Sequence, residues 1–481
     1  MSDMYLESAN ELRVYDTCDI LVVGGGAAGH SAAVAAARAN PDAKIILMER
    51  YGYFGGNVTG GLVLMVPSLT WGKFSVIRGL QEEWFSRLDE KAPGSYISPK
   101  LEDAGKTTPI LVDRWSRIHG CTTFGEPKSL VRAPYYEPNH LKIEVDLMVQ
   151  ECPNITMLLH CWGTKPIMEG NVIKGVIFES KEGRQALFAK IVIDATGDGD
   201  IFGQTDPVCH GKSGLTGENQ RDDQTALVWR VGGVDYDAYA RWFAANPVVG
   251  KNFLATLMEI AGYRTMFFPA GCNNIVWFNN WLSGMNCIDL KDIRATELTV
   301  RNSIRRILDF CKEAIPFAFE NAYVVDIAPQ LGVRGSRRLD GELYLTMKDL
   351  QANPFYDDCI AWSSVMAVGA PIEIPYRCIL SKHTENLICP GRHLSADEHA
   401  IGPLQLIPQC VQTGQAAGVA AAVAIKDGST AKTVDIKKVQ YILSHDQDVP
   451  LPRQDNTNAE LLAAMEACNY GRDFKVPRPQ F

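Results

Sequence analysis

The stretch CDILVVGGGAAGHSAA, residues 18–33, decides the fold of this chain. Its apolar run 20–23 ends abruptly in glycine, which is typical of a buried parallel strand. The Ala-rich segment 27–39 predicts a helix, and the Asn-Pro pair that follows ends it. Residues 44–48 form a second apolar strand. The order strand, turn, helix, strand predicts the first unit of a Rossmann-like α/β domain.

The glycines between the first strand and the helix have the spacing G-x-G-x-x-G, at Gly24, Gly26 and Gly29. Such a turn lets the backbone approach a pyrophosphate, which the free N–H groups of the helix N-terminus then bind. Glu49 follows the second strand, where a carboxylate accepts hydrogen bonds from ribose hydroxyls and disfavours a 2′-phosphate. A glycine-rich turn without a ligand is the alternative, but the strands, helix and acid together predict a bound dinucleotide.

Further motifs follow in order along the chain. ERYGYFGGNVTGG, residues 49–61, adds a second glycine cluster that a plain NAD domain does not need. KIVIDATGDGDIFGQTD (190–206) is a strand that runs into a T-G-D-G-D turn, and LGVRGSRRLDGELYLT (331–346) is rich in arginine. ICPGRHLSADEHAIGPLQLIPQCVQTGQAAGVAAA (388–422) ends in an Ala-rich helix. In this order the motifs resemble those of the FAD-dependent oxidoreductase family with a G-G-N motif after the first acidic strand, a two-dinucleotide-binding-domain flavoprotein type.

The resemblance implies that the chain binds FAD and that the last of these helices points its N-terminus at the flavin ring. The residues that it places around the cofactor are Gly24, Gly26, Ala27, Ala28, Gly29, Glu49, Arg50, Gly55, Gly56, Asn57, Thr59, Ala195, Thr196, Gly197, Asp198, Gly391, Arg392, Gly402, Gln405 and Leu406.

The sequence departs from the family pattern at two places. Gly335 and Ser336 stand where the family usually has an acidic residue and a threonine. Near the flavin, Glu398 and His399 reverse the usual His-Glu order, and Gln405 replaces the usual arginine. These changes make it unsafe to borrow a substrate from relatives.

The motif order predicts a discontinuous Rossmann-like FAD-binding domain with a β-meander, the turn-rich segment 154–180, plus an inserted substrate-capping domain rich in aromatic residues. For any single aromatic residue, packing in the core is the expected role. The expected divisions are 15–68, 132–206 and 375–428 for the FAD-binding domain, 69–131 and 207–374 for the cap, and 429–481 for a C-terminal helical tail.

Four side chains are candidates for catalysis. His399 lies inside the flavin-proximal motif, and histidine titrates near neutrality, although it could also only cap or pack against its loop. If the segment around Arg334 and Arg338 is a strand, the two share a face and could clamp a substrate carboxylate or carbonyl. Pairing with structural acids such as Asp340 is the alternative. Tyr376 is a weaker candidate.

Composition bounds the function. The chain has 481 residues, a net charge of −9 and a pI near 5.6, which disfavour nucleic acid or an anionic membrane as the main partner. No apolar run approaches the roughly 18 residues of a membrane span. The 13 cysteines contain no C-x-x-C pair and suggest reduced thiols in the cytoplasm rather than a metal site.

These observations predict an FAD-dependent dehydrogenase or reductase that transfers a hydride between flavin N5 and a small organic substrate. With one dinucleotide fingerprint, the chain lacks a built-in NAD(P)H domain, so an external electron acceptor or donor is needed: oxygen, a quinone or a carrier protein. The alternative is a non-redox flavoprotein, a hydratase, lyase or isomerase, in which FAD acts structurally or electrostatically. Homo-oligomers are possible, and substrate identity and reaction direction stay open.

Overall fold

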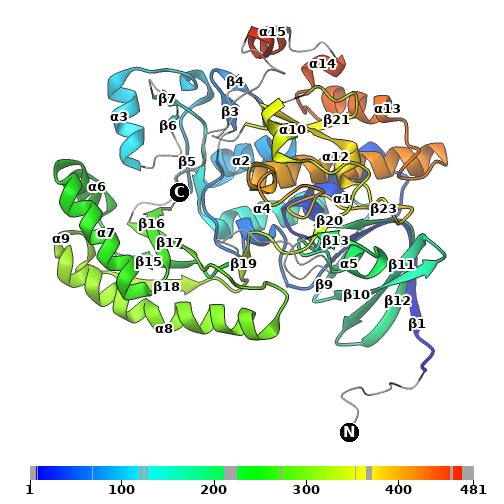
Figure 1. Cartoon of the computed structure of the whole chain (residues 1–481), viewed down its shortest axis with the longest axis horizontal. Helices are drawn as coiled ribbons and strands as arrows, with labels where there is room; N and C mark the ends of the chain where they lie inside the picture. The colour runs from blue at the N-terminus through cyan, green and yellow to red at the C-terminus, as the bar shows by residue number, and fades with distance from the viewer. Residues whose placement is uncertain are drawn as a thin grey trace.

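The strand–helix–strand unit around the first glycines is present as β1 (Arg13–Val23), α1 (Ala27–Ala39) and β2 (Ile45–Glu49) (Figure 1). The structure is a computed structural model. It describes residues 7, 9–67, 69–118, 123–124, 128–210, 225–270, 274–352, 354–364, 371–455 and 459–467.

One seven-stranded sheet forms the centre of the cofactor-binding part, in the order β10-β11-β12-β1-β2-β9, with β23 beside β12. Strands β12, β1, β2 and β9 are mutually parallel, whereas β10, β11 and β12 form an antiparallel meander. Within the predicted meander segment 154–180, β10 and β11 form the antiparallel pair as expected and β12 continues it, but β9 extends the parallel sheet instead. The added strands are β9 (Ile155–Leu159), β10 (Trp162–Glu169), β11 (Val172–Ser180), β12 (Gly183–Asp194) and β23 (Leu387–Ile388).

The parallel register brings three strand ends to one edge of the sheet. Val23 of β1 pairs with Met48 of β2 and with Asp194 of β12. Gly24 continues from this edge, and its N–H donates to the Met48 carbonyl at 2.8 Å. Ligands of open parallel sheets bind beyond the carboxyl ends of the strands, so this edge is where the fold opens toward a ligand.

Two Ala-rich helices, α1 and α12 (Ile407–Asp427), pack against each other at unusually close range. A Cβ atom added to Gly414 or Gly418 would lie 2.1 Å from the Ala28 or Ala32 carbonyl oxygen, respectively. Only glycine fits these two positions, because any larger residue would collide with the backbone of α1. This contact fixes the N-terminal end of α12 next to that of α1.

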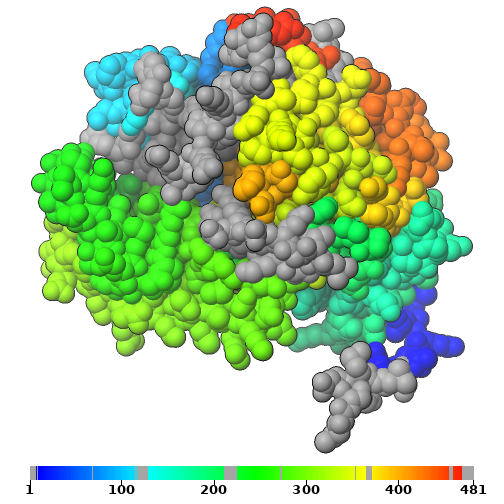
Figure 2. All heavy atoms as spheres, in the orientation of Figure 1, coloured from blue at the N-terminus to red at the C-terminus, as the bar shows by residue number. Residues whose placement is uncertain are grey.

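The 225–327 segment forms a second, antiparallel sheet in the order β16-β17-β15-β18. Figure 2 shows this segment, in green, along one side of the molecule. Its elements are β15 (Trp229–Gly232), α6 (Tyr236–Ala245), α7 (Pro247–Ala261), β16 (Arg264–Pro269), β17 (Ile275–Trp281), α8 (Leu290–Ala314), α9 (Pro316–Phe319) and β18 (Tyr323–Ile327).

Short elements connect these parts. Before the second sheet they are β3 (Thr70–Trp71), β4 (Phe74–Ser75), α2 (Leu80–Lys91), β5 (Tyr96–Ile97), α3 (Pro109–Ile118), β6 (Thr123–Phe124), β7 (Ser129–Leu130), β8 (Tyr135–Tyr136), α4 (Pro138–Gln150), α5 (Phe202–Thr205), β13 (Cys209–His210) and β14 (Thr225–Ala226). After it come β19 (Gly332–Val333), β20 (Arg338–Leu339), α10 (Met347–Ala352), β21 (Cys359–Ser363), β22 (Ile372–Pro375), α11 (Ile401–Leu404), α13 (Ile436–Tyr441), α14 (Pro452–Asp455) and α15 (Ala459–Ala467). The domain limits expected from the sequence stay predictions.

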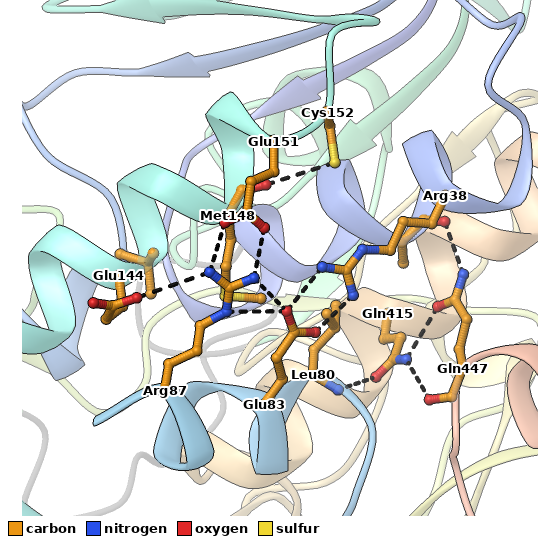
Figure 3. A network of polar contacts seen from close by, with 12 residues as sticks. Arg38, Leu80, Glu83, Arg87, Glu144, Met148, Glu151, Cys152, Gln415 and Gln447 are labelled. Carbon is orange, nitrogen blue, oxygen red and sulfur yellow. Dashed lines mark hydrogen bonds and ion pairs between the residues drawn. The ribbon is translucent and has the colours of Figure 1, made fainter. Parts of the chain in front are cut away.

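A polar network, drawn in Figure 3, ties α2 to the cofactor-binding part. Glu83 of α2 binds Arg38 of α1 at 2.6 Å and Arg87 at 2.8 Å, and Arg87 reaches Glu151, next to α4, at 2.5 Å. Ion pairs in a shared network restrain one another's side chains more than isolated surface pairs do. The network therefore orients α2 against α1 and α4.

His30 of α1 is fully buried and contacts the helices α2 and α4. Its Nε2 lies 3.0 Å from the Val145 carbonyl oxygen, and its ring contacts Trp84 edge-on. Burial lowers the pKa of His30 to about 4 from an ordinary 6.5. The group therefore stabilises the fold fully above pH 6.5 and progressively less as the pH falls toward 4.

We expect this group alone to lower the free energy of unfolding by about 2 kcal/mol between pH 7.5 and pH 5. Urea titrations at both pH values measure the loss, and His30→Gln, which cannot titrate, should show a shallower decrease. Equal decreases in the parent and the variant would assign the pH dependence to other groups.

None of the helices in the described part of the chain is both long and apolar enough to cross a membrane.

Candidate functional site

A cavity of about 1340 Å³ opens at the sheet edge and continues to the second sheet. Most of the residues that the sequence predicts to contact the cofactor line this cavity. Those that line it are Gly24, Gly26, Ala27, Ala28, Glu49, Arg50, Gly56, Asn57, Ala195, Thr196, Gly197, Gly391, Arg392, Gly402, Gln405 and Leu406. Segments that are far apart in the chain thus meet around one space.

The glycine turn fits a pyrophosphate. Gly24 has a φ of +95°, and a Cβ atom there would lie 2.6 Å from the Ala195 carbonyl oxygen. At Gly29 a Cβ atom would lie 1.7 Å from the Gly24 carbonyl oxygen. Gly26 differs, because its backbone is ordinary (φ −65°, ψ −170°) and an added Cβ would meet only the Gly56 Cα, at 3.9 Å, among the described residues. Neither the backbone conformation nor the packing of the protein requires glycine at position 26. A phosphate bound close to this backbone does require it, because a side chain would occupy the same space.

The start of α1 is open to an anion. Its N-cap residue is glycine (Gly26), which has no side chain to cap the free N–H groups, and the first turn holds no acidic residue. Free N–H groups and the positive end of the helix dipole favour a negatively charged group at this point. The residues present therefore fit the pyrophosphate of a dinucleotide.

Glu49 lies beside this turn, at the end of β2. Its carboxylate accepts hydrogen bonds from the N–H groups of Gly25 (2.6 Å) and Tyr51 (2.9 Å). Burial raises the pKa of Glu49, although these N–H groups act in the opposite direction. Each carboxylate oxygen keeps a second acceptor position for a ribose hydroxyl. Arg50 lies over the rings of Tyr51 and Trp162, which gives this end of the cavity flat walls suited to adenine.

The T-G-D-G-D turn supports the opposite wall. Asp198 is buried, accepts a hydrogen bond from the Ser336 hydroxyl and pairs with Arg392 at 2.8 Å. Burial disfavours its charged form, but Arg392 and Ser336 outweigh this and lower the pKa of Asp198. A Cβ atom at Gly197 would overlap the Arg392 guanidinium, so glycine is needed for the arginine to lie there. Asp198 itself holds Arg392 rather than lining the cavity.

Asp200, two residues further on, does line the cavity. Burial, together with the negative charges of Asp198 and Asp194, raises the pKa of Asp200 to about 6. Arg337 lies 3.5 Å away and offsets only part of this effect. A carboxyl group with such a pKa can donate as well as accept a hydrogen bond near pH 6.

The second sheet supplies the far wall of the cavity. On β16, Arg264, Met266 and Phe268 alternate with buried Thr265 and Phe267, as strand geometry requires. Directly opposite on β17, the register pairs these lining residues with Trp281, Asn279 and Trp277. All six of the alternating residues line the cavity. One face of this hairpin is therefore turned to the ligand, and the other packs against α6 and α7.

His399 lines the cavity, on the loop before α11. Asp397 shapes this loop, because its carboxylate accepts hydrogen bonds from the N–H groups of His399 (2.9 Å) and Ala400 (2.6 Å). The side chain of His399 is 72% exposed and pairs with Glu398 at 3.4 Å. The histidine is thus positioned by its backbone and accessible at the cavity, and its catalytic role stays a prediction.

The predicted shared face of Arg334 and Arg338 is wrong. The segment is not one strand, because β19 ends at Val333 and β20 begins at Arg338, each with a different partner strand. Arg334 lines the cavity. Arg338 is buried outside it, and its Nε donates to the Ala396 carbonyl at 2.8 Å. Arg338 therefore supports the His399 loop from behind instead of clamping a substrate.

Tyr376 also lies away from the cavity. It is buried, and its hydroxyl donates to the Ala431 carbonyl at 2.9 Å. Burial raises the pKa of Tyr376, which makes proton transfer at this hydroxyl harder. The structure therefore does not support Tyr376 as a catalytic group.

Gly29, Gly55 and Thr59 were predicted to contact the cofactor but do not line the cavity. Gly29 allows α1 to approach the first glycine turn at Gly24. Gly55 has a φ of +96°, and the buried Thr59 hydroxyl donates to the Phe54 carbonyl at 2.5 Å. Gly55 and Thr59 therefore shape the segment that carries Gly56 and Asn57.

The polar lining residues that sequence reasoning missed include Arg264, Asn279 and Gln330. Gln330 is 9% exposed, and its Oε1 has no hydrogen-bond partner among the described residues. The strand-like alternation of side chains in 264–269 and 275–281 could have indicated that Arg264 and Asn279 lie on one exposed face. No periodic pattern surrounds Gln330.

Within the described part of the chain, no group of His, Cys, Asp and Glu side chains has the arrangement of a metal site.

Solved structures of similar architecture include a geranylgeranyl bacteriochlorophyll reductase-like protein from Thermoplasma acidophilum. It is 13% identical, with a TM-score of 0.46 over 94% of this chain and 99% of that one. p-Nitrophenol 4-monooxygenase from Pseudomonas putida is 10% identical, with a TM-score of 0.45 over 95% and 96%. No curated protein matches the sequence. The family model of FAD-dependent oxidoreductases matches residues 19–443, and the chain therefore belongs to that family and uses FAD as its cofactor.

Proposed function

We propose that this chain is an FAD-dependent dehydrogenase or reductase that transfers a hydride between its flavin and a small organic substrate, with an external electron acceptor or donor. The continuous cavity carries the proposal: it runs from the glycine turn at Gly24–Gly26 to the aromatic face of the β16–β17 hairpin. The first end fits the dinucleotide, and the second leaves room for a substrate. The chain has one dinucleotide fingerprint, so no second domain is expected to bind NAD(P)H.

Bound FAD supplies a hydride acceptor or donor at N5. The residues of this chain supply position and proton transfer. When an alcohol or amine C–H bond gives up its hydride, the neighbouring O–H or N–H loses a proton, and we assign the acceptance of this proton to His399, which lines the cavity. Arg338 and Asp397 hold the loop that carries this histidine.

The cofactor assignment predicts a yellow protein that releases FAD, and not FMN, on denaturation. The glycine turn and Glu49 serve a pyrophosphate and an adenosine ribose, both of which FMN lacks. Chromatography of the released flavin measures this. A colourless protein that takes up no FAD after unfolding and refolding would contradict the site as described.

Anaerobic mixing of the holoenzyme with a metabolite panel tests the reaction class. Bleaching of the flavin absorbance by an organic substrate alone supports the proposal. Bleaching by NADPH or NADH alone would assign the chain to monooxygenase or NAD(P)H-reductase chemistry. Product formation without any bleaching would favour a non-redox role of FAD. Parallel assays with oxygen and a quinone then identify the acceptor.

A further inference from the structure

We propose that Arg264 and Arg334, which flank Trp281, bind the carboxylate of the substrate, so that the substrate is an aromatic or otherwise apolar organic acid. This inference names the substrate class of the proposed function. It rests on that function in one respect: it takes the molecule that binds at this wall to be the substrate. It replaces the expected pair of Arg334 and Arg338, of which Arg338 is outside the cavity.

The two arginines meet through the tertiary structure. Arg264 begins β16 and lies directly opposite Trp281 of β17. Arg334 follows β19, which pairs with β14, and Thr225 of β14 bridges to Leu282, next to Trp281. The guanidinium carbons of Arg264 and Arg334 lie 4.8 Å and 5.2 Å from the Trp281 ring centroid. Both cations thus converge on one ring at the cavity wall.

Arg264 is equipped to bind an anion. It is only partly buried, and no described residue accepts a hydrogen bond or forms an ion pair with its guanidinium. A cation–π contact with Trp281 holds the group without using up its N–H donors. Arginine donors match the two oxygens of a carboxylate, and such charge-assisted pairs are among the strongest hydrogen bonds in proteins.

The acidic residues that line the cavity in the described part of the chain have partners other than Arg264. Glu49 accepts backbone N–H bonds, Asp200 lies near Arg337, and Glu398 pairs with His399. In a chain of net charge −9, an arginine at the cavity wall whose guanidinium rests on a tryptophan ring selects an anionic ligand from solution.

The rest of the wall defines the remainder of the ligand. Met266, Phe268 and Trp277 continue the same hairpin face away from Arg264, with Asn279 beside them as a polar contact. Flat apolar side chains bind flat apolar groups, and a few placed polar groups orient them. A carboxylate at one end and an apolar or aromatic body at the other match this arrangement.

Calorimetry on the oxidised holoenzyme tests the proposal with benzoate, phenylacetate and hexanoate, each beside its uncharged amide. We expect at least one carboxylate to bind about tenfold or more tightly than its amide. Arg264→Gln and Arg334→Gln should each weaken that carboxylate about 10- to 100-fold and leave the amide nearly unchanged. Arg241→Gln, an exposed arginine of α6 outside the cavity wall, is the matched control and should bind as the parent does.

Two results overturn the proposal: no carboxylate binds more tightly than its amide, or both cavity variants bind the carboxylate as the parent does. Retention of flavin in each variant, read from its absorbance, shows that the fold is intact. Binding needs no flavin reduction. The protein could therefore bind carboxylates in this way while no organic substrate bleaches its flavin. That result would support the carboxylate subsite and contradict the proposed hydride transfer.

Discussion

Gly26→Val should abolish tight FAD binding while the protein still folds. Valine places a branched side chain where the backbone approaches the pyrophosphate most closely. In the protein itself an added Cβ at this position meets only the Gly56 Cα among the described residues, at 3.9 Å, so the loss falls on the cofactor. We expect purified Gly26→Val to be nearly colourless, with a circular dichroism spectrum like that of the parent. FAD titration of both proteins by fluorescence quenching measures the difference.

Gly24→Ala is the contrasting variant. Its φ of +95° and the 2.6 Å approach to the Ala195 carbonyl oxygen make any side chain strained there, with or without FAD. We therefore expect Gly24→Ala to lower the stability of the cofactor-free protein, and Gly26→Val to lower it far less. If Gly26→Val binds FAD as tightly as the parent, the pyrophosphate lies elsewhere.

His399→Asn should keep FAD bound and slow flavin reduction by substrate by about 10²- to 10⁴-fold, the usual contribution of a positioned general base. Asparagine has a similar reach but cannot accept the proton, so the loss falls on the proton-transfer step. Anaerobic rapid mixing of the parent and the variant with substrate measures the two rates. The His399 side chain is exposed, and the loop is held by hydrogen bonds to its backbone N–H, so we expect the variant to fold normally.

His445→Asn is the control for this experiment, because His445 stacks on Tyr441 outside the cavity. It should leave the rate unchanged. Reduction of His399→Asn at the parental rate would give the histidine a structural role. The proton acceptor would then be sought at Asp200 or Glu398, whose carboxylates line the same cavity, since Tyr376 is buried away from it.

Local sequence predicted which glycine-motif residues meet at the cavity. The run 20–23, the glycine spacing and the acid at 49 lie within 30 residues of one another, and their arrangement follows from the local strand–turn–helix–strand conformation. The side chains outside these motifs were predicted less well. Arg338 was assigned to the site because its sequence spacing suggested a shared strand face, but the chain breaks between β19 and β20 and turns that side chain inward.

The sequence by itself determined the Rossmann-like unit, the family and the cofactor. Each of these depends on short motifs in which the same few residues set the backbone conformation and contact the ligand. The tertiary structure alone decided which side chains share the cavity. Arg264 and Arg334 are 70 positions apart in numbering, and they converge on Trp281 only through the register of β16 with β17 and the pairing of β19 with β14. Strand register between distant segments is set by the packing of whole faces, a physical property that no single stretch of sequence contains.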